Sequence, residues 1–178
     1  MLMICSVLQL YGQKSTLQIY NYSSYYLEAV LEANGLSGNC FPKISLSDYS
    51  TNPLTIPPGS LSNPFIAVYP KYNLGPSSSV PVQQWLVQSS ATNTPIVRQA
   101  SHPSLNDTSI FTTATDWTEC HMVTRDANFI YSDELEMGNP SYDQCNSHSY
   151  TYRLASVTEA EWFTITSGAD KYTIVQVF

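Results

Sequence analysis

The residues with the most specific chemistry are two cysteines and two histidines in the second half of the chain. Cys120 and His121 are adjacent, and Cys145-Asn-Ser-His148 follows them. Two thiolates and two imidazoles form a common tetrahedral zinc set. Adjacent residues of a strand point to opposite faces, so Cys120 and His121 reach one ion only if the strand bulges. We therefore expect no metal and no cofactor, with Cys120 and Cys145 either joined as a disulfide or buried as thiols.

A second candidate site is acidic. The segment Asp133-Glu-Leu-Glu136, together with Asp143, would hold calcium if a loop folded these carboxylates together. The segment lacks the repeated Asp-x-Asp order and the glycine of a specific calcium loop. We expect a solvated acidic loop instead.

Catalysis has little support in the sequence. His102, His121 and His148 are the available general bases, but no G-x-S-x-G turn marks a nucleophile. A glycosidase-like acid pair cannot be singled out among the acidic residues. We predict that the protein is not an enzyme, and a hydrolase on a β scaffold is the third alternative.

The composition limits the partners. Only 12% of the 178 residues are charged, the net charge is −7, and 13 residues are tyrosine. The sequence contains no run of Lys or Arg, which argues against nucleic acid as a partner. Hydroxyl, amide and tyrosine side chains instead suit contacts with membrane lipid, with glycan, or with copies of the same chain.

Short runs of β-branched and aromatic residues recur along the chain, each closed by Gly, Pro, Asn or Ser. This pattern predicts an all-β, two-sheet β-sandwich, in a single domain over 1–178. Segment 25–33 also has helical spacing, but we favour a strand because its surroundings are β. The expected strands are 2–11, 15–22, 25–33, 41–47, 64–70, 80–88, 95–99, 108–115, 119–124, 128–132, 149–157, 161–166 and 171–178.

The two ends of the chain are both expected to be strands. Residues 1–10 are apolar but have no preceding basic residue and no small-residue cleavage pattern, so they are interpreted as a strand rather than a targeting segment. No apolar run is long enough to cross a membrane. The alternation over 172–178 predicts a strand covered on both faces. The sequence does not decide whether the protein is soluble in the cell, secreted or virion-associated.

One third of the chain resembles small β-sandwich cytolysins of the aegerolysin and actinoporin kind. The similarity covers about residues 16–70: a strand ending in Asn21 and Ser23, then Gly35, and a Pro58-Gly59 turn leading to Phe65. The resemblance implies membrane recognition through exposed aromatic side chains. A Trp-rich lipid-facing segment, the amphipathic N-terminal helix and an Arg-Gly-Asp are not found, so pore formation is not implied.

The proline-rich region 48–81 is the predicted recognition surface. Tyr69, Tyr72 and Trp85 are the candidate binding residues, because an aromatic ring held between stiff prolines loses little entropy on contact. The alternative for Tyr72 is a lid over the sandwich core. The first functional hypothesis is thus a lipid- or glycan-binding recognition protein, and its main alternative is a self-assembling structural protein such as a coat or crystal component.

Overall fold

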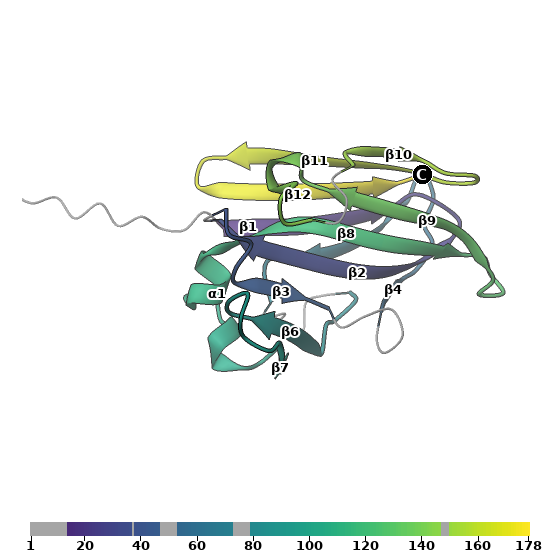
Figure 1. The fold of residues 1–178 in the computed structure, drawn as a ribbon. Coiled ribbons are helices and arrows are strands. Elements are labelled where there is room, and N and C mark those ends of the chain that lie inside the picture. The colour runs from purple at the N-terminus through teal and green to yellow at the C-terminus, as the bar shows by residue number, and fades with distance from the viewer. Residues whose placement is uncertain (1–13, 37, 47–52, 73–78, 147–149) are drawn as a thin grey trace, which may run out of the picture.

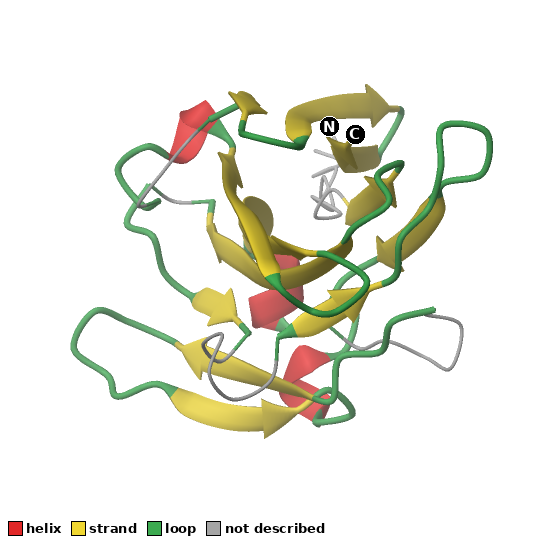
Figure 2. Ribbon diagram, turned by 90° about the vertical axis from the view of Figure 1, so that its right-hand side faces the viewer, coloured by secondary structure: helices red, strands yellow, loops and turns green. Residues whose placement is uncertain are grey.

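The computed structural model describes residues 14–36, 38–46, 53–72, 79–146 and 150–178. Strand makes up 51% of the structure, and two sheets pack against each other, which confirms the predicted two-sheet sandwich (Figures 1 and 2). The strand expected at 2–11 lies outside the described residues. Among the described residues, no helix is long and apolar enough to cross a membrane.

The first sheet, sheet A, brings the two ends of the described chain together. Its central pair is β1 with β12, which run parallel, and its other pairs are antiparallel. Its strands, in spatial order, are β10 (Tyr152–Leu154), β11 (Glu159–Ser167), β12 (Asp170–Val177), β1 (Lys14–Asn21) and β5 (Phe65–Tyr69).

The second sheet, sheet B, is antiparallel and is built around the long strands β2 and β8. Its strands, in spatial order, are β7 (Ile96–Gln99), β6 (Gln84–Gln88), β3 (Lys43–Ser45), β2 (Tyr26–Gly35), β8 (Thr115–Arg125) and β9 (Tyr131–Gly138), with β4 (Leu54–Ile56) also paired to β2. The short helical segments are η1 (Pro103–Leu105), α1 (Ile110–Thr113) and η2 (Pro140–Tyr142).

Alternating burial identifies which face of each strand meets the core. In β2 the side chains of Leu27, Ala29 and Leu31 are fully buried while the residues between them are partly exposed, so this segment is the strand that was predicted. In β12 only one face is fully buried, with Val175 and Val177 at 0% exposure. The prediction that β12 is covered on both faces is therefore wrong, because none of the described segments forms a third layer over the outer face of sheet A.

Two other segments differ from the expected elements. The strand expected at 108–115 is wrong, since the Ser109 hydroxyl accepts from the Thr112 backbone N–H and starts α1. Ser is a favoured N-cap because its oxygen satisfies an otherwise unpaired donor. The acidic segment 133–136 is not a loop but part of β9, and the strand expected at 128–132 begins only at Tyr131.

The cysteines pair differently from the expectation. Cys40 and Cys145 form the disulfide, which links residues 105 positions apart. Cys120 faces the core with a buried, free thiol. Of the two alternatives, the Cys120–Cys145 bridge is therefore wrong, because Cys120 lies in the middle of sheet B and is directed between the sheets. The alternative of buried thiols holds for Cys120 but not for Cys145.

A buried asparagine makes the corner where the chain leaves sheet A for sheet B. Asn21 ends β1 and is 0% exposed. Its side-chain N–H groups donate to the carbonyls of Tyr25 and Pro57, both at 2.8 Å. Its side-chain oxygen accepts from the N–H and the hydroxyl of Ser23 at 3.0 and 2.6 Å. One amide thus fixes both the β1–β2 corner and the segment that returns from β4 to β5.

The returning segment needs a glycine where it passes this corner. A Cβ on Gly59 would lie 2.1 Å from the Asn21 carbonyl oxygen and 2.6 Å from the Phe65 nitrogen. Both are backbone atoms, so no rotation of a side chain could make room. The Gly59 N–H instead donates to the Ser23 carbonyl at 2.9 Å, which closes the corner.

We expect Asn21→Ala to destabilise the fold by about 2–4 kcal/mol, because it leaves buried donors and acceptors without partners. Urea denaturation of wild type and variant measures this difference. Asn63→Ala is the matched control, since Asn63 is exposed in the loop after Gly59 and its substitution should change stability by less than about 0.5 kcal/mol. Equal effects of the two substitutions would contradict the role given to the corner.

Candidate functional site

The three aromatic residues predicted to bind a partner lie in the core. Tyr69, Tyr72 and Trp85 are each 0% exposed. The Tyr69 hydroxyl donates to the Val80 carbonyl at 3.1 Å, and the Trp85 ring N–H donates to the Tyr72 carbonyl at 2.9 Å. The prediction that these rings form a surface is therefore wrong, and Tyr72 takes the alternative position as part of the core.

Mutual packing of large rings explains this placement. The Tyr72 ring contacts Trp85 and Trp117 edge-on, with ring centroids 5.3 and 5.5 Å apart. Its hydroxyl bonds to the Thr115 hydroxyl at 2.5 Å, so the polar end of the ring is satisfied inside the protein. Burial raises the Tyr72 pKa above its ordinary range. These ring contacts and the hydroxyl bond hold Tyr72 in the core rather than presenting the ring to solvent.

The Cys and His set that was weighed as a zinc site, and not expected to bind one, is not assembled among the described residues. Cys145 is held in the disulfide with Cys40, and His148 lies outside the described residues. Cys120 and His121 point to opposite faces of β8, as the alternation of a strand requires, with Cys120 buried and His121 partly exposed.

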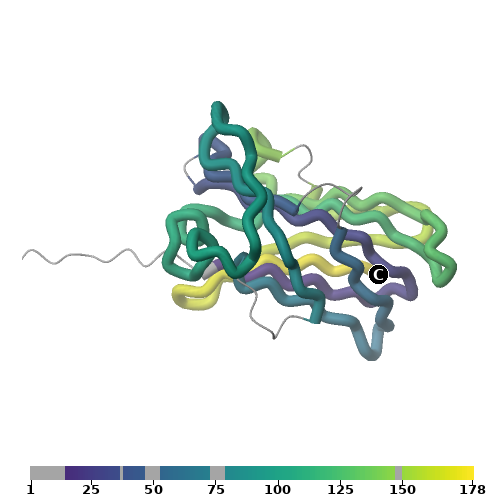
Figure 3. Tube along the Cα trace, turned by 90° about the horizontal axis from the view of Figure 1, so that it is seen from below, coloured from purple at the N-terminus to yellow at the C-terminus, as the bar shows by residue number. Residues whose placement is uncertain are grey.

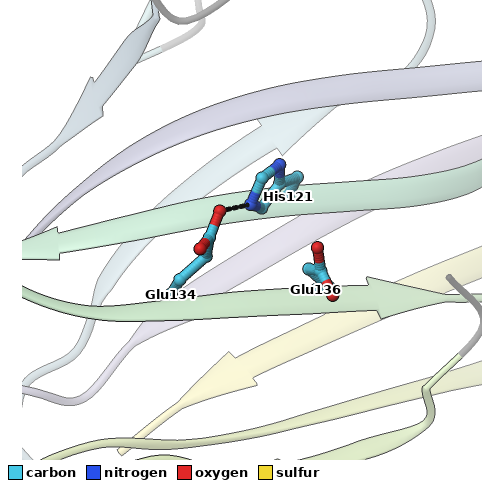
Figure 4. A group of neighbouring side chains, drawn as sticks. All are labelled: His121, Glu134 and Glu136. Atoms are coloured by element: carbon cyan, nitrogen blue, oxygen red, sulfur yellow. Dashed lines mark hydrogen bonds and ion pairs between the residues drawn. The ribbon is translucent and has the colours of Figure 1, made fainter. Parts of the chain in front are cut away.

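The structure instead brings together residues from both predicted metal clusters. His121 from β8 and Glu134 and Glu136 from β9 lie on the outer face of sheet B (Figure 4). Their ligand atoms all lie within 4.8 Å of one another, and His121 Nε2 is 2.6 Å from a Glu134 carboxylate oxygen. Sequence spacing gave no sign of this set because it depends on the register of β8 against β9. The other two acidic residues considered for calcium lie elsewhere. Asp133 is buried and points inward, and Asp143 is exposed just after η2.

Exposed apolar side chains gather elsewhere, on the loops at one end of the sandwich. We call this end the loop end and define it as residues 22–25, 57–64, 126–130 and 155–158. Figure 3 shows that the β8–β9 hairpin and the segment after β4 both lie at the end where the C-terminus is. The exposed fractions of its large apolar side chains are 76% for Leu61, 50% for Phe129, 61% for Ile130 and 52% for Val157.

Specific contacts join these loops. Gly59 bonds to Ser23, which connects the second loop to the first. The Phe129 ring stacks on Tyr26 with centroids 4.7 Å apart, which connects the hairpin to the start of β2. Three of the four loops of the loop end are therefore joined, either directly or through the start of β2.

The hairpin tip holds its apolar residues outward by its own hydrogen bonds. The Asp126 carboxylate accepts from the N–H groups of Asn128 and Ile130 at 2.8 and 2.9 Å. Phe129 has a φ of 60°, a left-handed conformation that costs an aromatic residue about 1–2 kcal/mol. Strain of this kind is a feature of functional sites, and here it places an exposed ring at a protruding turn.

Asp133 attaches the fourth loop to β9. Its carboxylate accepts from the N–H groups of Ser156, Val157 and Thr158 at 3.1, 2.8 and 3.0 Å, and from the Thr158 hydroxyl at 3.0 Å. Burial on its own would raise the pKa of Asp133, but these hydrogen bonds outweigh it and lower the pKa below its ordinary value. The ionised carboxylate is thus the form that fixes Val157 at the loop end.

We expect Tyr72→Ala to lower the free energy of unfolding by about 3–5 kcal/mol, because it empties a large space in the aromatic core and removes the Tyr72–Thr115 hydrogen bond, leaving the Thr115 hydroxyl only its bond to the Phe111 carbonyl. Thermal and urea denaturation test this. Tyr152→Ala, on the exposed strand β10, is the control and should have a small effect. Unchanged stability of the Tyr72→Ala protein would contradict the placement of Tyr72 in the core.

We expect Asp133→Asn to destabilise the protein by about 1–3 kcal/mol at pH 7, because the amide cannot accept all four hydrogen bonds. A lowered pKa in the folded state stabilises the fold above the unfolded pKa of about 3.9, and this contribution is lost as the pH falls through the folded pKa. The difference between wild type and variant should therefore shrink below about pH 4. Urea denaturation at both pH values measures it, and a difference independent of pH would contradict the assignment.

Comparison with known proteins adds no relative. No family model, no curated protein and no solved structure matches this chain. The function of the loop end therefore rests on its geometry.

Proposed function

We propose that this protein is a non-enzymatic recognition domain that binds membrane lipid by inserting the apolar side chains of the loop end among the headgroups. The observation that carries the proposal is the exposure of Leu61, Phe129, Ile130 and Val157 on loops at one end of the sandwich. Exposed apolar side chains that lie at the same end of a protein are a candidate interaction site.

The charge of the loop end supports lipid as the partner. Its four loops contain a single charged residue, Asp126. That carboxylate accepts hydrogen bonds from two backbone N–H groups of its own turn, so part of its polarity is already satisfied. A surface with apolar residues, serines and almost no charge can enter a headgroup layer without desolvating many ions.

The same charges favour neutral over anionic membranes. The chain carries a net charge of −7, which repels a surface of anionic lipid. No Lys or Arg lies within the loop end to oppose this repulsion. Binding is therefore expected to be apolar in origin, and to depend little on salt with neutral lipid.

The resemblance of residues 16–70 to the β-sandwich cytolysins agrees with this proposal. The residues that carry the resemblance, among them Asn21, Ser23 and Gly59, build the corner that supports the loop end. Their role in this chain is to shape the surface, while the apolar residues that would enter the membrane lie mostly on other segments.

Self-association is the second candidate, and the outer face of sheet A favours it. Ile66, Phe163 and Ile165 are 41%, 36% and 48% exposed on this face, and Tyr152 is 52% exposed at its edge. Register places Phe163 opposite Ile174 and Ile165 opposite Tyr172, so the apolar side chains form a continuous strip across β11 and β12. A flat strip of this kind suits a copy of the same chain.

Flotation with phosphatidylcholine vesicles tests the lipid proposal. We expect the wild-type protein to float with the vesicles, and phosphatidylserine in the same vesicles to reduce the bound fraction. Ile130→Ser should weaken binding about tenfold, because it removes an apolar side chain worth more than 1 kcal/mol when buried. Ile130 is 61% exposed, so folding stability should change little.

The matched control is Ile110→Ser in α1, away from the loop end, where the side chain is 71% exposed. This variant should bind vesicles like the wild type. Absence of wild-type binding, or equal loss in both variants, would overturn the lipid proposal. Sedimentation as large particles in the tubes without vesicles would support self-association instead.

A further inference from the structure

We propose that His121, Glu134 and Glu136 bind one divalent transition-metal ion on the outer face of sheet B. The site uses none of the residues of the loop end, so it stands apart from the proposed lipid binding.

The strand register puts the three side chains on one face. His121 lies directly opposite Glu136 in the antiparallel pairing of β8 with β9. Glu134 is two positions before Glu136 on the same strand, so both glutamates project on the same side. In Figure 4 the His121 ring is hydrogen-bonded to the Glu134 carboxylate, and the Glu136 side chain lies near them on the same strand as Glu134.

The distances suit an ion. In a tetrahedral site with bonds of about 2.0–2.2 Å, two ligand atoms lie about 3.4 Å apart. Here the closest pair, His121 Nε2 and Glu134 Oε1, is 2.6 Å apart, and all three ligand atoms lie within 4.8 Å. The separation of about 3.4 Å between ligand atoms falls between these values, so small side-chain rotations would bring the three ligand atoms to tetrahedral positions around one ion. The ion would replace the hydrogen bond that now joins the imidazole to the Glu134 carboxylate.

The backbone that carries the ligands is held in place. β8 is paired on one side with β2 and on the other with β9, and His121 lies opposite Val30 as well as Glu136. On the inner face, its neighbours Cys120 and Met122 are 0% exposed. A ligand set on paired strands over a packed core loses little entropy when an ion binds.

The surrounding charge favours a cation. Glu28, Glu32 and Glu119 share this outer face with the two ligand glutamates by strand alternation. Two basic residues pair with them: Arg125 with Glu28 at 2.5 Å, and Lys43 with Glu32 at 2.6 Å. Among the described residues, the carboxylates on this face outnumber the Lys and Arg side chains that pair with them, and a bound dication would lower the repulsion between the carboxylates.

The ligand types select the class of ion. Imidazole nitrogen is a good ligand for zinc and its neighbours in the transition series, whereas calcium and magnesium prefer oxygen alone. Glu134 is exposed and the other two ligands are partly exposed, so the ion would keep open positions for water or for a carboxylate of a partner. The chemistry of the site is thus that of an accessible, three-ligand zinc site.

Isothermal titration of the full, EDTA-treated chain with zinc chloride tests the proposal. We expect one equivalent of zinc to bind, and His121→Ala, Glu134→Gln and Glu136→Gln each to reduce the affinity at least tenfold. Calcium chloride should give no competing signal. Cobalt(II) provides a second measurement, because its visible absorption should show a low-symmetry site in the wild type and lose those bands in Glu136→Gln.

Glu161→Gln, on the outer face of sheet A, and His102→Ala, beside η1, are the controls that should keep full zinc affinity. Circular dichroism checks that every variant is folded. The proposal fails if the wild type binds no zinc, or if the three ligand variants bind it as tightly as the controls do.

Discussion

The side chain of Asn21 is the constraint on which most of this sandwich depends. A single buried amide satisfies two carbonyls and two donors where the chain passes from sheet A to sheet B and where it returns. Because buried polar groups are costly when unpaired, these four bonds permit few other paths for the chain. These bonds also orient the loop end, since the Asn21 side chain is bonded to both 22–25 and 57–64.

Local patterns predicted the strands well and the placement of aromatic side chains poorly. Alternation identified β1, β2 and β12, and the Asn and Pro-Gly signals marked the corner correctly. Tyr72 and Phe129 could not be told apart by their neighbours, since both lie next to turn-forming residues. Which ring is buried depends on Trp85 and Trp117 arriving from other strands, and no local pattern contains that information.

The candidate metal site shows a related limit. His121 was grouped by the sequence with cysteines, and Glu134 and Glu136 with other acids. Their meeting depends on a turn at residues 126–130 that sets which residue of β9 faces which residue of β8. A shift of register by one residue would direct both glutamates into the core. A loop over 133–136, as the acidic composition predicts, excludes the strand pairing that unites the three residues.

The parallel pairing of β1 with β12 has a consequence for how the protein is made. β1 is synthesised before β12, yet β12 is its parallel neighbour in the centre of sheet A. Until β12 leaves the ribosome, Leu17 and Ile19 lack that neighbour, and one edge of β1 has unpaired N–H and C=O groups. Nascent chains should therefore be most vulnerable to mispairing with one another until β12 has been synthesised, and slow folding from such distant contacts extends that interval.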